Sequence, residues 1–224
     1  MIRVTASPSG LLELSGGSPR ERQALHAEFE RRNCVRLPGF LAPDLLEEVL
    51  ERVNDSSFYS RDHGDIGTEE CAEAGPALAL LLLVANDPRL FELVREVTGC
   101  GEIGCFDGRV YRIDPARGHH DSWHSDVGDN RLVAMSVNLS TEPYEGGVLE
   151  IRDQRTGEIT GRPSELEPGE VVMFRIAEHL RHRVSPVTGD VPRLAFAGWF
   201  KSAPSFRSVL AGGPWTTELA ERTA

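Results

Sequence analysis

The first hundred or so residues carry apolar side chains at helical spacing. The segment "SPRERQALHAEFERR" opens with Ser18, a good N-cap residue, followed by a proline that suits the first helical position. The segment "NDPRLFELVREVTG" repeats this arrangement, with Asp87 as the cap and Gly99 at the end. Helices are therefore predicted over 18–32, Ala42–Val53, Pro76–Ala85 and 86–99.

From about Ile103 the pattern changes to short segments in which alternate residues are apolar. In "RLVAMSVNLS" one face carries Val133, Met135, Val137 and Leu139, and the other carries Leu132, Ala134, Ser136 and Asn138. Strands separated by turns at this spacing predict a sandwich or a closed barrel. The other strand candidates are 108–114, 145–153, 169–176 and 193–200. The polar, glycine-containing segment Asn54–Glu70 is predicted to be a loop.

A chain of 224 residues fits one domain with a substantial core. We expect a single catalytic domain over 1–224. Its parts are a helical N-terminal support over about 1–102, a β core over about 103–202, and a C-terminal tail over 203–224.

The composition narrows the classes of partner. The net charge of −11 disfavours nucleic acid and anionic membranes, because both require a basic face. The longest apolar run, "PALALLLLVA", is too short to span a bilayer, and the N-terminus does not resemble a signal peptide. None of the four cysteines forms a C-x-x-C pair. We therefore expect a cytoplasmic protein with reduced thiols, while the sequence leaves its oligomeric state open.

The stretch "GHHDSWHSD" contains two His-x-Asp pairs, His119/Asp121 and His124/Asp126. A third pair, His63/Asp65, lies in the predicted loop, and we expect it to be a solvated loop pair because no strand is predicted around it. Each pair alone is weak evidence for a metal, since such triplets arise often by chance.

A third ligand downstream strengthens the metal hypothesis. Two histidines and a carboxylate form the facial triad of non-haem Fe(II) oxygenases, which leaves coordination positions open. Such sites bind a chelating co-substrate whose far carboxylate needs a cation. Arg193 follows His182 by eleven residues. If the two residues lie on antiparallel strands, they can face the same pocket, and the Arg193 guanidinium can bind that carboxylate through two parallel hydrogen bonds. Along the last strand Arg193, Ala195, Ala197 and Trp199 share one face.

The segment from about Arg109 to Phe200 resembles the Fe(II)/2-oxoglutarate-dependent dioxygenases, nearest to their prolyl-hydroxylase-like and phytanoyl-hydroxylase-like branches. The motifs that carry the resemblance occur in the family's order: "WHSD", "RLVAMSVNLS", "YEGGVLEIRD", "GEVVMFRIAEHLRHRVSPV" and "PRLAFAGWF". The resemblance implies an α+β fold with a mainly β core, a double-stranded β-helix (jelly roll) with N-terminal supporting helices.

The resemblance also implies which residues bind iron: His124, Asp126 and His182. His124 and Asp126 are preferred over the first pair because Trp123 precedes them and a strand follows at the family's usual distance. His182 is preferred over His179 because it directly precedes "RVSPV", and His179 is expected to be a surface or supporting residue.

Further residues are implied at the co-substrate. Arg193 would bind the far carboxylate of 2-oxoglutarate, and Tyr111 and Asn138 are candidates for further hydrogen bonds to it, although each also suits a structural role. Arg131 occupies a position where relatives often have arginine, and we expect it to be at the surface. Relatives often carry Ser or Thr where this chain has Ala195, so one hydrogen bond to the co-substrate is absent or comes from elsewhere, for example from Tyr111.

The remaining candidates are residues near the metal motifs. They are expected to select the substrate or to support the metal ligands. They are His119, His120, Asp121, Arg112, Trp123, Arg152 and Trp199, with Arg117 and Arg175 as further candidates for binding an acidic group.

The implied chemistry uses Fe(II), 2-oxoglutarate and O₂, releases succinate and CO₂, and hydroxylates an unactivated C–H bond. Related halogenases mostly have a small residue in place of the aspartate, so Asp126 favours hydroxylation, with desaturation and ring formation left open. The short, acidic chain favours a small-molecule substrate such as an amino acid or a specialised metabolite.

Two other classes stay open. A cupin-like metal-binding barrel without oxygenase activity would use the same three ligands but leaves Arg193 unexplained. A non-catalytic binding module is the other alternative, although such proteins usually lose a metal ligand.

Overall fold

The computed structural model describes residues 1–6 and 12–204, so most of the expected tail at 203–224 lies outside the described residues. Its helices are α1 (Pro19–Arg32), α2 (Pro43–Asn54), α3 (Pro76–Ala85) and α4 (Pro88–Thr98), with one 3₁₀ turn at Pro115–Arg117. The early strands are β1 (Arg3–Ala6), β2 (Leu12–Ser15), β3 (Cys34–Leu37), β4 (Phe58–Asp62) and β5 (Gly67–Ala72). The later strands are β6 (Cys105–Ile113), β7 (His120–Asp121), β8 (Arg131–Asn138), β9 (Glu145–Gly146), β10 (Leu149–Asp153), β11 (Ile159–Gly161), β12 (Val171–Arg175), β13 (Leu180–Val184), β14 (Val187–Thr188) and β15 (Arg193–Lys201).

All four predicted helices are confirmed, and two of them have the predicted caps. The Ser18 hydroxyl accepts a hydrogen bond from the Glu21 N–H at the start of α1. Asp87 accepts one from the Arg89 N–H at the start of α4, and Gly99 ends that helix in the left-handed conformation.

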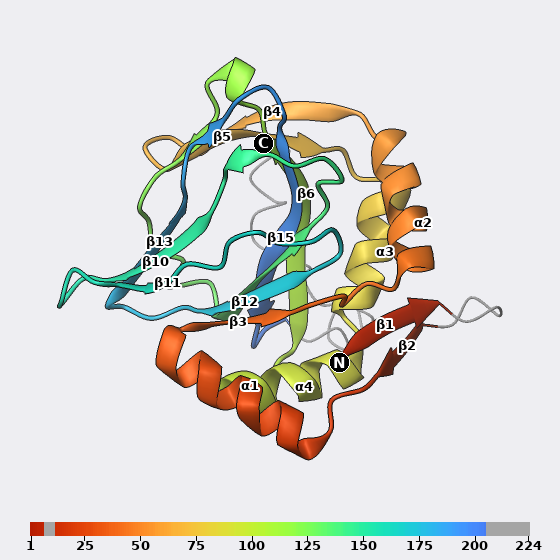
Figure 1. Ribbon diagram of the computed structural model, residues 1–224, viewed down its shortest axis with the longest axis vertical. Helices are drawn as coiled ribbons and strands as arrows, with labels where there is room; N and C mark the ends of the chain where they lie inside the picture. Colours follow the sequence, from red (N-terminus) through yellow and green to blue (C-terminus); the bar gives the residue numbers. More distant parts are fainter. Residues whose placement is uncertain (7–11, 205–224) are drawn as a thin grey trace.

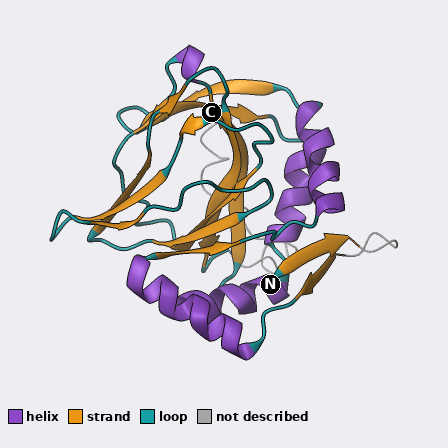
Figure 2. Ribbon diagram, in the orientation of Figure 1, coloured by secondary structure: helices purple, strands orange, loops and turns teal. Residues whose placement is uncertain are grey.

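The strands form one large curled sheet, one smaller three-stranded sheet and two separate two-stranded pairs, β1-β2 and β14-β9, as expected for a jelly roll (Figures 1 and 2). The large sheet has the order β3-β12-β8-β15-β6-β5-β4, with β7 paired to β5. The small sheet has the order β11-β10-β13. The mainly β fold with supporting helices is therefore confirmed.

The large sheet is buried on both faces. The helices pack on its outer face, where Met135, Met173 and Phe196 join a core with Phe29, Leu45, Leu81 and Leu93. On the inner face a second cluster, which includes Ala134, Ile151 and Phe174, lies between the two sheets. This double burial matches the predicted alternation along β8.

The predicted loop at Asn54–Glu70 is wrong, because it contains β4 and most of β5, which pair antiparallel from Phe58↔Ala72 to Asp62↔Thr68. The sequence of β4, "FYSRD", lacks apolar alternation because this strand forms the edge of the large sheet and ends in exposed residues. The expected helical support over about 1–102 therefore also supplies β3, β4 and β5 to the large sheet.

The expected geometry of the last two motifs also needs correction. His182 lies on β13 of the small sheet, whereas Arg193 begins β15 of the large sheet, so the two strands are not antiparallel neighbours. The two side chains nevertheless face the same interior, because the sheets curl toward each other.

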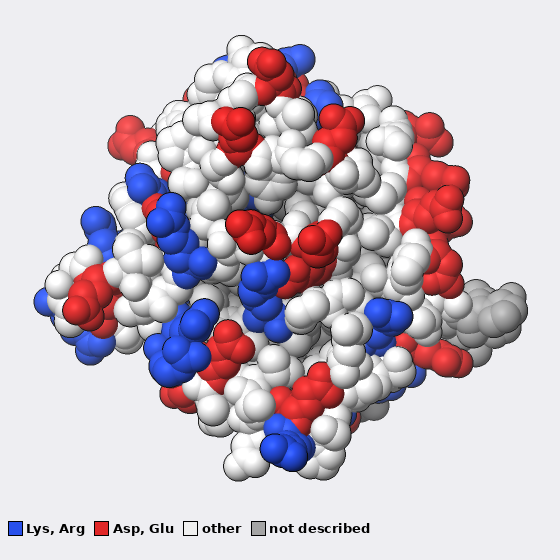
Figure 3. Space-filling view, viewed as in Figure 1, with Lys and Arg blue, Asp and Glu red and all other residues white. Residues whose placement is uncertain are grey.

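Charge is unevenly distributed over the surface. In the view of Figure 3, acidic side chains gather along α2 at the right, where Asp44, Glu47, Glu48 and Glu51 are exposed. Basic side chains gather at the left, over the small sheet. Within the described residues, none of the helices is long and apolar enough to cross a membrane.

Gly198 offers a test of the packing of the two central strands. A Cβ at this position would lie 2.0 Å from the Asp107 carbonyl oxygen and 2.4 Å from the Gly108 Cα. Because backbone cannot yield as a side chain can, we expect Gly198→Ala to lower the free energy of unfolding by about 3 kcal/mol. The urea unfolding midpoint measures this loss.

Gly101→Ala is the matched control, since a Cβ there meets no atom within 4 Å. It should change the midpoint little. Equal stability of the two variants would contradict the strand pairing described here.

Candidate metal centre

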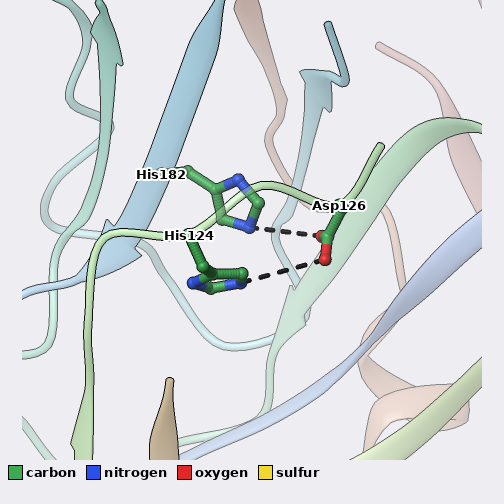
Figure 4. A group of neighbouring side chains, drawn as sticks. All are labelled: His124, Asp126 and His182. Carbon is green, nitrogen blue, oxygen red and sulfur yellow. Dashed lines mark ion pairs between the residues drawn. The ribbon is translucent and has the colours of Figure 1, made fainter. Parts of the chain in front are cut away.

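Three side chains converge inside the barrel: His124 and Asp126 from the segment after β7, and His182 from β13 (Figure 4). His182 Nε2 lies 3.2 Å from Asp126 Oδ2, and His124 Nε2 lies 3.8 Å from Asp126 Oδ1. One ligand atom from each residue lies within 4.8 Å of the others. The side chains of His124, Asp126 and His182 are only 17%, 8% and 12% exposed.

The backbone holds the two histidines together. The His124 N–H donates to the His182 carbonyl at 3.0 Å, and the His182 N–H donates to the His124 carbonyl at 3.0 Å. This reciprocal antiparallel bridge joins the segment after β7 to the small sheet. The spacing of the two imidazoles is therefore set by the main chain.

The other ring nitrogen of His124 has its own partners. Nδ1 lies 2.7 Å from the Ser122 carbonyl oxygen and 3.3 Å from Asp121 Oδ1. Both partners are acceptors, so the proton belongs on Nδ1 and the lone pair of Nε2 faces Asp126. Asp121 is held in turn by the Val184 N–H, which donates to its Oδ2 at 2.7 Å.

Asp126 is fixed by two neighbours besides the histidines. Trp199 Nε1 donates to Oδ2 at 2.6 Å, and the Arg131 guanidinium lies 3.4 Å from Oδ1. Burial by itself would raise the pKa of Asp126, but the contacts with His182 and Trp199 outweigh it and hold the pKa well below its usual range. Asp126 is therefore an ionised carboxylate.

The donor set fits an iron ion. Two neutral imidazoles and one carboxylate are the ligands of a facial triad, which leaves positions open for other molecules. Support of a ligating imidazole by a carboxylate, as Asp121 gives His124, is typical of metal sites.

A buried arginine lies deeper in the same interior. Arg193 is 3% exposed, donates from Nη1 to the Tyr111 hydroxyl at 2.7 Å, and approaches Ser136 Oγ at 3.5 Å. Its Nε is buried without a hydrogen-bond partner among the described residues. Burial raises the pKa of Tyr111, so this hydroxyl stays neutral. An unpartnered guanidinium N–H beside two hydroxyls fits a bound carboxylate.

These two groups share one cavity of about 300 Å³. Its wall includes His124, Asp126, His182, Arg193 and Tyr111 together with Ser136, Trp199, Asp121 and His120. The predicted face of β15 is confirmed at Arg193, Ala197 and Trp199, which all line the cavity.

Several predicted site residues lie elsewhere. The Asn138 amide donates to the Leu166 carbonyl and accepts from the Ser140 N–H, a structural role outside the cavity. The His119 imidazole accepts from the Asp114 N–H and does not line the cavity. The predicted substrate contacts of Arg112, Arg117, Arg152, Arg175 and Trp123 are likewise not supported, because these side chains lie outside the cavity wall.

The same residues have other partners. Arg112 and Arg117 pair with Glu70, and Arg175 pairs with Glu30. Trp123 lies against the guanidinium groups of Arg152 and Arg183.

The structure adds cavity residues that the sequence did not indicate. Arg131, expected at the surface, lies with its guanidinium carbon 3.9 Å from the Trp199 ring centroid. His63, expected in a solvated loop, lines the cavity and contacts Glu69, which pairs with Arg109. Arg131 was misplaced because its partner Trp199 lies on a distant strand, and His63 was missed because its partner Glu69 lies on the part of β5 that was predicted to be a loop. Tyr144, which packs beside Arg193 across Gly147, was also missed, although "PYEGG" precedes a recognised motif.

Glu69 and Arg109 form a buried ion pair. The Arg109 Nε lies 2.6 Å from Glu69 Oε1, and His63 Nε2 lies 2.9 Å from the same oxygen. Burial would raise the pKa of Glu69, but the hydrogen bond from His63 and the charge of Arg109 outweigh it and lower the pKa to about 2. The pair is therefore fully charged at neutral pH.

Residues 108–201 match the family model of the 2OG-Fe(II) oxygenase superfamily. This range begins within β6 and ends with β15, and it contains the histidine–aspartate–histidine group as well as Tyr111 and Arg193. No curated protein is similar enough in sequence to be matched to this chain.

Solved structures of similar fold include a Pseudomonas putida prolyl-4-hydroxylase, with 20% identity, a TM-score of 0.61, and coverage of 82% of this chain and 100% of that one. A Trichoplax adhaerens prolyl hydroxylase in complex with a hypoxia-inducible-factor peptide fragment has 16% identity, a TM-score of 0.62, and coverage of 82% and 90%. The α-ketoglutarate-dependent epimerase SnoN from nogalamycin biosynthesis has 18% identity, a TM-score of 0.60, and coverage of 89% and 92%.

The similarity to these solved structures shows that the fold is shared. The match to the family model indicates which chemistry the fold performs. The matched range holds both the histidine–aspartate–histidine group and the buried Arg193. Residues 108–201 therefore match the 2OG-Fe(II) oxygenase superfamily, and this match supports a 2-oxoglutarate-dependent dioxygenase that uses Fe(II), 2-oxoglutarate and O₂.

Proposed function

We propose that this protein hydroxylates an unactivated C–H bond of a small molecule, with release of succinate and CO₂. The observation that carries the proposal is a cavity lined by both the histidine–aspartate–histidine group and Arg193, whose Nε has no hydrogen-bond partner among the described residues. Iron supplies the activation of O₂ when bound. The residues of the chain hold the metal, orient the co-substrate and admit the substrate.

Metal binding is assigned to His124 Nε2, Asp126 and His182 Nε2. The Ser122 carbonyl fixes the tautomer of His124, and Trp199 holds Asp126 through its Oδ2. Three protein ligands would leave other coordination positions open for the co-substrate and O₂.

Co-substrate binding is assigned to Arg193 and Tyr111, supported by Ser136 and Tyr144. A carboxylate beside Arg193 would accept a hydrogen bond from Nε–H, which has no partner among the described residues. The neighbouring hydroxyls of Tyr111 and Ser136 would donate further hydrogen bonds to the carboxylate. Ser136 on β8 supplies a hydroxyl in place of the one that Ala195 lacks, since its Oγ lies 3.5 Å from Arg193 Nη2.

The size of the cavity supports a small substrate. A volume of about 300 Å³ lies at the lower end of ligand-binding pockets, and 2-oxoglutarate must fit in the same space.

The product distinguishes hydroxylation from desaturation, ring formation and epimerisation. A gain of one oxygen atom, measured by mass spectrometry, supports hydroxylation, and a product without it contradicts this assignment.

The metal assignment predicts the effect of removing single ligands. His124→Ala and Asp126→Ala should each abolish succinate formation from 2-oxoglutarate and bind Fe(II) far more weakly, because two protein ligands hold a metal poorly. Equilibrium Fe(II) binding and succinate assays measure both effects.

His119→Ala serves as the control, because His119 belongs to the neighbouring His-x-Asp pair and its imidazole accepts from the Asp114 N–H, away from the cavity. It should retain both iron and activity. Loss of iron in His119→Ala with retention in His124→Ala would show that the wrong pair has been assigned.

Arg193 should govern affinity for the co-substrate. Arg193→Met removes a charged, partly bidentate contact, and we expect 2-oxoglutarate to bind roughly 100-fold more weakly while Fe(II) still binds. Anaerobic titration of the Fe(II) protein, followed by the visible charge-transfer band, gives the affinity. Arg112→Gln is the control outside the cavity, and the assignment is wrong if both variants bind 2-oxoglutarate like the native protein.

Asp121 should act by positioning His124. Asp121→Asn keeps the shape but removes the charge beside Nδ1, so we expect Fe(II) affinity to fall by roughly 10- to 100-fold. The exposed Asp65 of the loop pair provides the control Asp65→Asn. Unchanged iron affinity in Asp121→Asn would mean that the Ser122 carbonyl alone orients the imidazole.

A further inference from the structure

We propose that Glu69 and Arg109 form the recognition pair for the zwitterionic head group of a free α-amino acid, whose side chain then extends toward the metal. This inference rests on the proposed function and names its substrate class. It makes the substrate a free amino acid and excludes a residue within a peptide.

The pair has unused hydrogen-bonding groups. Glu69 Oε1 takes all the contacts of its carboxylate: Arg109 Nε at 2.6 Å, His63 Nε2 at 2.9 Å and the Cys71 thiol at 3.4 Å. Oε2 has no hydrogen bond to any residue in 1–6 or 12–204, and the same holds for both terminal nitrogens of Arg109.

These free atoms are open to the cavity. Within the described part of the chain, the side-chain nitrogen and oxygen atoms that are buried and have no hydrogen-bond partner are the Nε atoms of Arg131 and Arg193. The free atoms of Glu69 and Arg109 therefore remain accessible, although Glu69 is only 8% exposed, and both residues line the cavity that contains the metal ligands. Arg109 also lines a second cavity beside Tyr59 and Asp107, so the metal cavity is the space that it shares with Glu69.

The free atoms complement an α-amino acid. The terminal nitrogens of an arginine fork bind a carboxylate through two parallel hydrogen bonds. A carboxylate oxygen beside the fork accepts from an ammonium group attached to the neighbouring carbon. Because Nε of Arg109 bonds to Glu69, the donor and acceptor sites lie side by side, as the two charges of an α-amino acid do.

The other cavity carboxylates are already engaged. Asp121 accepts from the Val184 N–H and contacts His124, and Asp126 belongs to the metal group. Among the carboxylates of the described cavity wall, Glu69 is thus the one that has an oxygen, Oε2, without a hydrogen bond and available to a ligand. His63 supports it from the loop between β4 and β5, so its position is fixed before a ligand arrives.

The pair lies within reach of the reacting centre. The Arg109 guanidinium carbon is 5.7 Å from the Trp199 ring centroid, and Trp199 Nε1 is 2.6 Å from Asp126. An amino acid bound at the pair would pass its side chain along Trp199 to the metal. A peptide residue has neither a free ammonium nor a free carboxylate, so it would leave the buried pair unmatched.

The first test uses the native protein loaded with Fe(II) and 2-oxoglutarate without oxygen. The probes are the twenty standard L-amino acids, with binding measured by calorimetry and by change in the visible band. We expect at least one to bind, and its N-acetyl and carboxamide derivatives to bind roughly 10- to 100-fold more weakly, since each loses one charged hydrogen bond.

The outcomes separate this inference from the proposed function. If Fe(II) and 2-oxoglutarate bind but no amino acid does, the recognition pair is wrong and the dioxygenase assignment stands. Equal binding of the free and the doubly blocked forms would also overturn the inference, in favour of a peptide substrate. If 2-oxoglutarate itself does not bind, the proposed function fails first.

Variants give a second, independent measurement. Glu69→Gln and Arg109→Gln should each weaken binding of the same amino acid by roughly 10- to 100-fold. Glu70→Gln and Arg112→Gln are matched controls, because they lie on the same strands but pair with each other on the outer side. Equal effects in both sets would overturn the inference, and if Glu69→Gln does not fold, the comparison of free and blocked amino acids still decides.

Discussion

The reciprocal backbone hydrogen bonds between His124 and His182 are the constraint on which the site depends. They join the segment after β7 to β13, and so tie the two walls of the barrel at the point where the metal ligands meet. Because main-chain bonds set this distance, the imidazoles are spaced before a metal binds. Only the ring orientations remain, and for His124 these are set by Ser122 and Asp121. Preorganisation of this kind lowers the cost of binding, since little side-chain freedom remains to be lost.

A second constraint comes from β15, whose inward face carries residues at both ends of the cavity. Arg193 lies at the start of the strand and Trp199 near its end, and the small Ala197 between them also lines the cavity. Trp199 contacts Asp126 directly and lies near the guanidinium groups of Arg131 from β8 and Arg109 from β6. Since β15 pairs with both of these strands, the arginines approach the indole from its two neighbouring strands.

Local sequence signals predicted the parts of the fold that depend on local chemistry. The caps of α1 and α4 and the alternation along β8 are properties of a few adjacent residues, and all three were predicted correctly. The convergence of His124, Asp126 and His182 followed from a family resemblance that orders distant motifs. In contrast, β4 has no periodic pattern because an edge strand is stabilised by its pairing rather than by its burial.

The missed cavity residues have the same origin. Glu69 on β5 finds its partner Arg109 on β6, forty residues away, and nothing in the neighbourhood of either residue indicates the pairing. The spacing of eleven residues also could not show that His182 and Arg193 lie in different sheets, because a segment of that length is long enough to cross from the small sheet to the large one. Pairings of this kind are decided by the global topology, and side chains near the metal motifs in sequence, such as Arg112, turn outward when the strand alternates.

The charges of the cavity connect these features. Apart from the exposed Arg61 at its rim, the wall carries three arginines, Arg109, Arg131 and Arg193, and three acidic residues, Glu69, Asp121 and Asp126. These charges cancel. The two positive charges of Fe(II) and the two negative charges of 2-oxoglutarate also cancel, so the cavity with both bound has no additional net charge. In a poorly hydrated cavity an extra net charge is costly, because water no longer screens it. A zwitterion keeps the filled cavity neutral and still satisfies the local charges of Glu69 and Arg109. A substrate with a single charge would satisfy one of these residues and leave the other unmatched.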